Sequence, residues 1–188
     1  LTASTSYTFT VSAATPGGTG PASAASNSIT TTMAPGTAYA GGFFAGQIST
    51  AGNGIADYNL VVAPVASGEA TNKQFNTMVQ SDPTSVIDGP ANSATMNNAN
   101  QQASFFCNAL TIGGYSDWYS PAKNELEVCY YNLKPGTATN NTASGANPNA
   151  VPARASNYTL GNPAQTAATA FQTGNSEAYI QDYYWCST

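Results

Sequence analysis

The chain has 188 residues, which allows one large domain or two small ones and a buried hydrophobic core. It is sparsely charged, with four Lys or Arg, nine Asp or Glu and no His. Four scattered cations cannot neutralise a row of phosphates, so we expect no nucleic-acid partner. Without His the commonest general base and metal ligand is missing, and we predict a non-enzyme with no catalytic residues, no metal site and no cofactor.

The three cysteines, Cys107, Cys129 and Cys186, are too few and odd in number for a disulfide framework. Cys107 and Cys129 lie on apolar faces of predicted helices, which favours buried thiols. One bridge with a thiol left over is the alternative. No apolar run approaches the roughly 20 residues of a membrane span, so we expect no membrane insertion.

Residues 1–32 predict a β-hairpin. Tyr7, Phe9 and Val11 alternate with threonines, as in a half-buried strand, and Pro16-Gly17-Gly18 ends it. A second strand is expected around Asn27–Thr32.

These residues resemble the last third of a fibronectin type III domain. Leu1, Thr5 and Tyr7 match its tyrosine corner, Phe9, Val11 and Ala13 its following strand, and Gly18, Gly20, Pro21 and Ser23 its final turn. The resemblance implies a structural Tyr7, whose hydroxyl bonds nearby backbone. A whole sandwich needs about 100 residues, so we expect the rest of the module, and the true N-terminus, upstream.

Residues 34–42 predict a linker, because small residues surround Pro35-Gly36. Phe43–Ile48 and Tyr58–Val65 then read as strands, with Pro64 near a strand end. Asn72–Gln80 predicts one or two helical turns. Ser81–Asn92 predicts a loop in which Asp82 and Asp88 form turns.

Two amphipathic helices are expected next. Met96–Leu110 places Ala103, Phe106, Cys107 and Leu110 on one face, and Gly113-Gly114 ends it. The second helix should have Ser120 as N-cap and Pro121 at its first position, and it should end at Pro135. Its predicted apolar stripe is Leu126, Cys129, Tyr130 and Leu133.

Gly136–Asn157 is a long polar tract, and long loops on a rigid scaffold commonly carry recognition. We therefore place a recognition surface on this tract and on the Ser81–Met96 loop. The predicted ligand-binding residues are Asn140, Asn141, Asn147, Asn149 and Tyr158.

Other candidate residues are interpreted as structural. Trp118 and Trp185 are able to stack on sugar rings, but each sits among core signals, which favours packing. Asp117 and Glu125 form no dense acidic cluster of the kind calcium needs, and capping of backbone is the favoured role.

Several motifs resemble the C-type-lectin-like domains at the ends of phage virion proteins and of a bacterial collagen-like adhesin. The matching residues are Cys107, Gly114, Asp117, Trp118, Pro121, Glu125, Leu126 and the closing Tyr184-Trp185-Cys186-Ser187-Thr188. Ser120 stands where the family usually has Leu, Ala122 where it has Ser or Thr, and Cys186 replaces a Ser. Without a hydroxyl at Ala122 the capping-box partner of Glu125 is lost. The family continues past this ending, so we expect a truncated C-terminus.

We therefore expect a mixed fold, a partial all-β fibronectin-like sandwich (1–33) followed by an α+β C-type-lectin-like domain (43–188). The implied function is that of a phage virion structural protein, a tail fibre, head fibre or capsid decoration presenting a lectin-like domain for host or glycan attachment at the virion surface. Expected partners are other virion proteins, further copies of the chain and a host-surface glycan or protein. The alternative is a bacterial cell-surface adhesin or pilus-like subunit. The fold also resembles formylglycine-generating enzymes, but Cys129 and Cys186 lie in different contexts and argue against catalysis.

Overall fold

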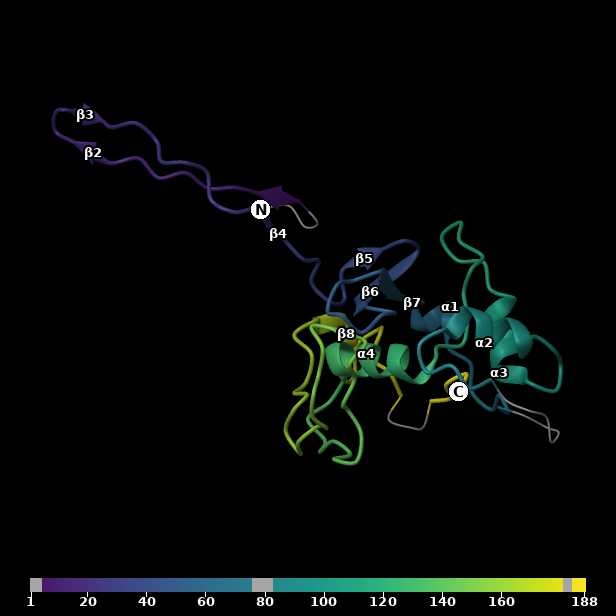
Figure 1. Ribbon diagram of the computed structural model, residues 1–188. Helices are drawn as coiled ribbons and strands as arrows, with labels where there is room; N and C mark the ends of the chain where they lie inside the picture. Colours follow the sequence, from purple (N-terminus) through teal and green to yellow (C-terminus); the bar gives the residue numbers. More distant parts are fainter. Residues whose placement is uncertain (1–4, 76–82, 181–183) are drawn as a thin grey trace. The chain divides into compact units, whose positions relative to one another are not determined.

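The computed structural model describes residues 5–75, 83–180 and 184–188 (Figure 1). Its described part mixes small β-sheets with four α-helices and one 3-10 helix. The chain divides into two compact units, Leu1–Ala34 and Pro35–Thr188. A mixed fold class is therefore confirmed at this coarse level.

The first unit is a β-hairpin, as predicted. Strand β1 (Ser6–Tyr7) pairs antiparallel with β4 (Ile29–Thr30), and β2 (Ala14–Thr15) pairs with β3 (Gly18–Thr19). Backbone hydrogen bonds from Ser23 to Val11 and from Ser26 to Phe9 continue the ladder between these pairs.

The expected burial of this hairpin is wrong. Phe9 is 49% and Val11 74% exposed, because two strands alone provide no second layer to cover an apolar face. Tyr7 is half-buried, and Leu1 lies outside the described residues.

The second unit contains a small antiparallel sheet. Its strands are β5 (Ala38–Tyr39), β6 (Gly42–Ile48), β7 (Tyr58–Val62) and β8 (Ala150–Val151). β6 pairs with the other three, and β8 comes from the long polar tract. β5 lies inside the range expected to be a linker. The second predicted strand ends early because Pro64 cannot donate to a ladder, and α1 (Val65–Gly68) follows instead.

The helices differ from the predicted ones in their bounds. α2 (Gly89–Thr95) begins inside the predicted loop, where the Asp88 side chain accepts a hydrogen bond from Ala91 N. α3 (Gln102–Asn108) is shorter than predicted, and α4 (Lys123–Leu133) begins three residues after Ser120. Asn72–Phe75 is not helical, and the remainder of that predicted helix lies outside the described residues.

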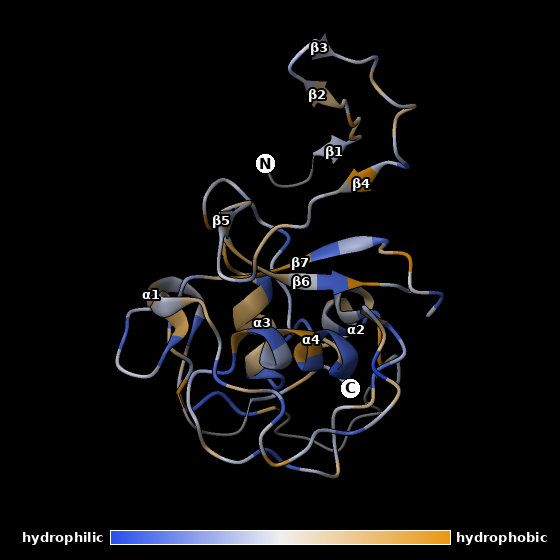
Figure 2. Ribbon diagram, turned by 90° about the vertical axis from the view of Figure 1, so that its left-hand side faces the viewer, coloured by the Kyte–Doolittle hydropathy of each residue, from blue (hydrophilic) through white to orange (hydrophobic). Residues whose placement is uncertain are grey.

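The core lies between α4 and the sheet, with α4 directly below β6 and β7 in Figure 2. Its buried residues are Ala45, Ile48, Leu60, Val128, Cys129, Leu133, Ala150 and Phe171, the last from the 3-10 helix η1 (Thr169–Phe171). Gly46 lets α4 approach, since a Cβ there would lie 2.6 Å from Val128 Cγ1. Among the described residues, no helix combines the length and apolarity needed to cross a membrane.

Candidate functional site

The start of α4 is held by segments distant in the sequence. The Lys123 N–H donates to Thr188 Oγ1 at 3.3 Å, and the Asn124 N–H donates to the Val86 carbonyl at 2.9 Å. The Thr188 hydroxyl in turn donates to the Ser85 carbonyl at 2.8 Å. Ser187 N donates to the Pro121 carbonyl at 2.7 Å. The Thr188 hydroxyl therefore accepts the hydrogen bond that an N-cap side chain would accept in other helices.

The prediction of Ser120 as N-cap is wrong. Ala122 occupies that position and has no side-chain acceptor, while Ser120 is buried and its N–H donates to Ser93 Oγ at 3.1 Å. One half of a capping box remains, because Glu125 Oε2 accepts from Ala122 N at 2.7 Å.

Glu125 is only 4% exposed and holds several neighbours together. Its Oε1 accepts a hydrogen bond from the Tyr119 hydroxyl at 3.2 Å, and Gly89 N also donates to this carboxyl. Burial raises the pKa of Glu125, and burial together with the charge of Glu125 raises the pKa of Tyr119. These contacts are those of a residue that joins α2 to α4.

Trp118 and Trp185 occupy different surroundings. Trp118 is half-buried and its Nε1–H donates to the Tyr115 carbonyl at 3.1 Å. Trp185 is 56% exposed, stacks on Phe75 at 5.3 Å between ring centroids, and donates from Nε1 to the Lys73 carbonyl. Asp117 is exposed, unlike Glu125, so the two carboxylates share no common environment.

The turn before Trp118 depends on glycine. Gly113 and Gly114 have φ angles of 61° and 85°, in the left-handed region. A Cβ on Gly113 would lie 2.5 Å from the Gly41 Cα, so the two turns touch through backbone alone.

Four of the five residues predicted to bind a ligand are buried: Asn140, Asn147, Asn149 and Tyr158. Asn147 is fully buried, and its Oδ1 accepts from the N–H groups of Asn149 and Ala150, both at 3.0 Å. Its Nδ2 donates to the Asn124 carbonyl at 2.8 Å. Asn149 is hydrogen bonded to Asn124 and to the Ser49 carbonyl. The burial of these four residues therefore argues against the prediction that they bind a ligand at the surface.

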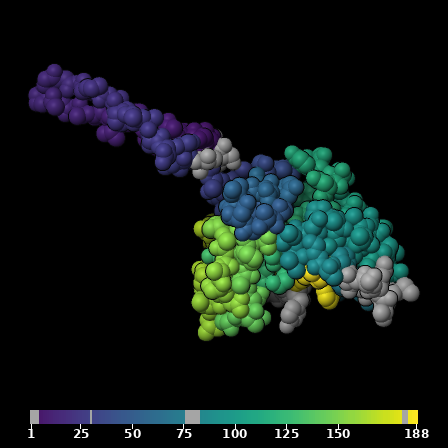
Figure 3. Space-filling model, viewed as in Figure 1, coloured from purple at the N-terminus to yellow at the C-terminus, as the bar shows by residue number. Residues whose placement is uncertain are grey.

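The other two buried residues fasten the same loop to α4. Asn140 Oδ1 accepts from the Tyr130 hydroxyl at 2.7 Å, and Asn140 Nδ2 donates to the Pro163 carbonyl. The Tyr158 hydroxyl bonds the Glu127 carboxylate. Of the five, only Asn141 is exposed. In Figure 3 the light-green atoms, which include this loop, form one continuous surface.

A buried lysine also holds this loop. Lys134 is 4% exposed, and its Nζ donates to the carbonyl oxygens of Ala138 at 2.5 Å and Pro163 at 3.1 Å. Burial lowers the pKa of its amine. The Lys134 amine therefore holds the loop by hydrogen bonds to two backbone carbonyls.

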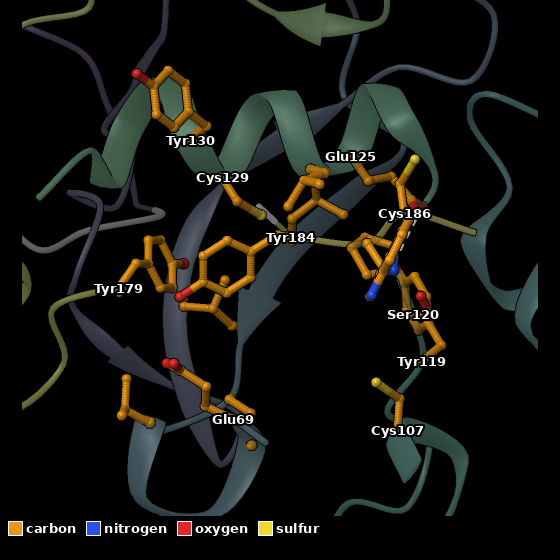
Figure 4. Close-up of a pocket in the computed structure, with 18 of the residues that line it drawn as sticks. Glu69, Cys107, Tyr119, Ser120, Glu125, Cys129, Tyr130, Tyr179, Tyr184 and Cys186 are labelled. Carbon is orange, nitrogen blue, oxygen red and sulfur yellow. Dashed lines mark hydrogen bonds between the residues drawn. The ribbon is translucent and has the colours of Figure 1, made fainter. Parts of the chain in front are cut away.

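A cleft of about 1210 Å³ lies beneath α4, bordered by β7, α1 and α3. Figure 4 shows Tyr179 and Tyr184 side by side under α4, Glu69 below them and Cys107 at the far end. Glu69, Tyr179 and Tyr184 share no sequence motif, so sequence reasoning did not combine them. The fold brings them together.

Burial shifts the pKa values of Cys107, Cys129 and Glu69 in the cleft towards their uncharged forms. Burial raises the pKa of Cys107 to about 11 and that of Cys129 to about 12, so both thiols stay protonated at neutral pH. Burial also raises the pKa of Glu69. All three cysteines are free thiols, and the Cys186 thiol donates to the Thr188 carbonyl. An activated thiol nucleophile is therefore not formed by Cys107 or Cys129.

Within residues 5–75, 83–180 and 184–188, no group of three or more Cys, Asp or Glu is placed to hold a metal ion. Comparison of the chain with protein-family models, curated proteins and solved structures gives no match.

Proposed function

We propose that this chain is a structural attachment protein of a phage virion, in a tail fibre, a head fibre or a capsid decoration. Its second unit, Pro35–Thr188, has a C-type-lectin-like fold and attaches the particle to a host-surface glycan or protein. The hairpin of the first unit belongs to a fibronectin type III-like module. Copies of the chain associate with one another and with other virion proteins.

The observation that carries the proposal is the meeting of separated motif segments at the start of α4. The resemblance rests on Trp118, Pro121, Glu125 and the closing Ser187-Thr188. Ser187 N bonds the Pro121 carbonyl, Thr188 caps Lys123, and Glu125 caps Ala122. Residues that define a fold are expected to make such scaffold contacts, and Pro121, Glu125, Ser187 and Thr188 make them.

The cleft supports binding rather than chemistry. The Cys107 and Cys129 thiols are protonated and burial raises the pKa of Glu69, so this part of the cleft offers hydrogen-bonding and aromatic surface. Ligand sites of proteins commonly combine apolar and aromatic walls with a few polar groups of this kind. A cleft with aromatic walls and hydrogen-bonding groups suits carbohydrate or a protein segment.

Two measurements test the proposal. Mass spectrometry of purified particles should detect peptides of this chain, and the full 188-residue chain, fluorescently labelled, should bind host cells and compete with intact particles for them. Peptides found only in a bacterial envelope fraction would favour the adhesin alternative. A chain present in particles that neither binds cells nor slows adsorption would contradict the attachment role.

A further inference from the structure

The loop between β6 and β7, residues 49–57, contains the one Asn-Gly pair in the sequence, Asn53-Gly54. Both residues are exposed, and nothing lies within 4 Å of the point where a Cβ on Gly54 would stand. Every other Asn of the chain is followed by a residue that has a Cβ. Because glycine allows the closest approach to its own backbone, the Asn53 side chain meets the least steric hindrance at the Gly54 nitrogen.

The side-chain oxygen of Asn53 is held by two donors. Its Oδ1 accepts hydrogen bonds from Ile55 N and from Ser49 Oγ, both at 2.9 Å. A backbone N–H only donates, so the atom that faces Ile55 is the amide oxygen. Ser49 is fully buried and its backbone is hydrogen bonded to Asn149, which fixes its hydroxyl. Donors aimed at a carbonyl oxygen stabilise the negative charge that develops there when a nucleophile adds to the carbon.

Two nitrogen atoms of the pair are left without hydrogen bonds to the residues that the structure describes. One is the backbone nitrogen of Gly54, although the N–H groups of Asn53, Ile55 and Asp57 on either side all donate. The other is the side-chain nitrogen of Asn53, Nδ2. A reaction that joins the first nitrogen to Asn53 Cγ and releases the second therefore breaks no hydrogen bond within the described part of the chain.

We propose that Asn53-Gly54 is a site of spontaneous deamidation through a cyclic imide. The Gly54 N–H gives its proton to hydroxide from the solvent, the nitrogen forms a bond to Asn53 Cγ, and the Cγ–Nδ2 bond breaks. Nδ2 takes a proton from water and leaves as ammonia, so that a succinimide ring remains. Water then adds to either carbonyl of the ring and opens it to an aspartate or an isoaspartate at position 53. Overall one water is exchanged for one ammonia, and nothing is oxidised or reduced.

The modification changes both the charge and the backbone of this loop. Its one ionisable side chain before the reaction is Asp57. Hydrogen bonds from the Thr50 hydroxyl and backbone N–H lower the pKa of Asp57, which is ionised at neutral pH, so the new carboxylate adds a second negative charge to the loop. An isoaspartate also lengthens the backbone between β6 and β7. This inference goes beyond the attachment function and does not depend on it.

The test incubates the full chain in mildly alkaline buffer made with heavy-oxygen water and maps its peptides by mass spectrometry. We expect heavy oxygen to enter position 53, in a mixture of aspartate and isoaspartate that chromatography separates, with an equal amount of ammonia released. Asn141 is the internal control. It is exposed and its Oδ1 accepts from Ala143 N at 2.9 Å, as Asn53 Oδ1 does from Ile55 N, but Thr142 follows it. Asn141 should keep its amide.

Variants test the ring closure and the role of the oxygen donors. Asn53→Gln places the carbonyl one methylene further away and should stop the reaction, whereas Asn141→Gln should leave it unchanged. Ser49→Ala removes one donor from the amide oxygen and should slow the conversion about fivefold, the equivalent of one hydrogen bond. An unchanged rate in a folded Ser49→Ala chain would contradict the role of this hydroxyl.

Three results would overturn the deamidation site itself. One is an intact Asn53 in the folded chain under conditions in which the urea-denatured chain reacts, because the loop then protects the pair. Another is aspartate without isoaspartate, which indicates direct hydrolysis of the amide and no ring. The third is equal conversion of Asn141, which would show that Gly54 makes no difference.

Discussion

Replacing Asn147 by Ala tests whether Gly136–Asn157 is held to the protein by buried hydrogen bonds or is an adaptable recognition loop. The substitution removes two acceptor contacts to backbone N–H groups and one donor contact to the Asn124 carbonyl, all in a fully buried side chain. Ala150 N keeps a second contact, to the Asn147 carbonyl at 3.3 Å. At about 1 kcal/mol for each lost hydrogen bond, we expect a loss of about 3 kcal/mol in the free energy of unfolding.

The loss is measured by urea unfolding followed by tryptophan fluorescence. Both tryptophans, Trp118 and Trp185, lie in the second unit, so the signal reports that unit alone. A loss of this size should lower the Tm by about 6–12 °C.

Asn141→Ala is the control, because Asn141 is exposed on the same loop and its Oδ1 accepts only a local bond from Ala143 N. Its stability should stay within about 0.5 kcal/mol of the parent chain. Equal stability of the two variants, with fast amide hydrogen exchange across the loop, would refute the reasoning and restore the loop as a recognition segment.

Three further predictions follow from buried ionisable groups. Burial raises the pKa of Glu125 in the folded protein above its usual 4.5, so the folded state retains a proton that the unfolded state releases, and the free energy of unfolding should fall as pH rises above 4.5. Urea unfolding of Glu125→Gln at a series of pH values should show a smaller fall, and an unchanged slope would contradict the assignment. Cys129, with its pKa raised to about 12, should resist iodoacetamide at pH 8 in the folded protein and react after denaturation, as peptide mass spectrometry will show; rapid labelling of the folded chain would argue against its burial. Lys134→Met removes the amine but keeps an apolar side chain, and it should lose about 1–3 kcal/mol in the free energy of unfolding measured with urea. Lys123→Met, at an exposed position, should cause no such loss, and equal effects of the two variants would rule out a role of the Lys134 amine in holding the loop.

Sequence patterns over a few residues correctly predicted the elements that depend on neighbouring residues alone. The strand over Phe43–Ile48 and the turn at Gly113-Gly114 were predicted, because a short apolar run and adjacent glycines act over a few residues. The α4 helix was predicted too, with Cys129 and Leu133 in the core. Its start was misplaced because the capping groups come from Thr188 and Val86 rather than from Ser120.

Composition misled where polar residues are buried. An Asn-rich tract with Val151 as its one substantial apolar anchor suggests an exposed loop, yet Asn140, Asn147 and Asn149 are buried. Their amides satisfy backbone groups of a loop that has little regular structure, a demand set by the folded path and not visible in the residue types.

The sequence by itself determined the low charge, the hairpin, the main strand and helix, and the motifs on which the proposed attachment function rests. Only the tertiary structure decided which polar residues are buried, what caps α4 and which groups share the cleft. The physical reason is range: hydrophobic periodicity and turn chemistry operate between neighbours in the chain. The contacts of Glu69 with Tyr184, of Thr188 with Lys123 and of Asn149 with Ser49 join residues 65 to 115 positions apart, and they exist only once the chain has folded.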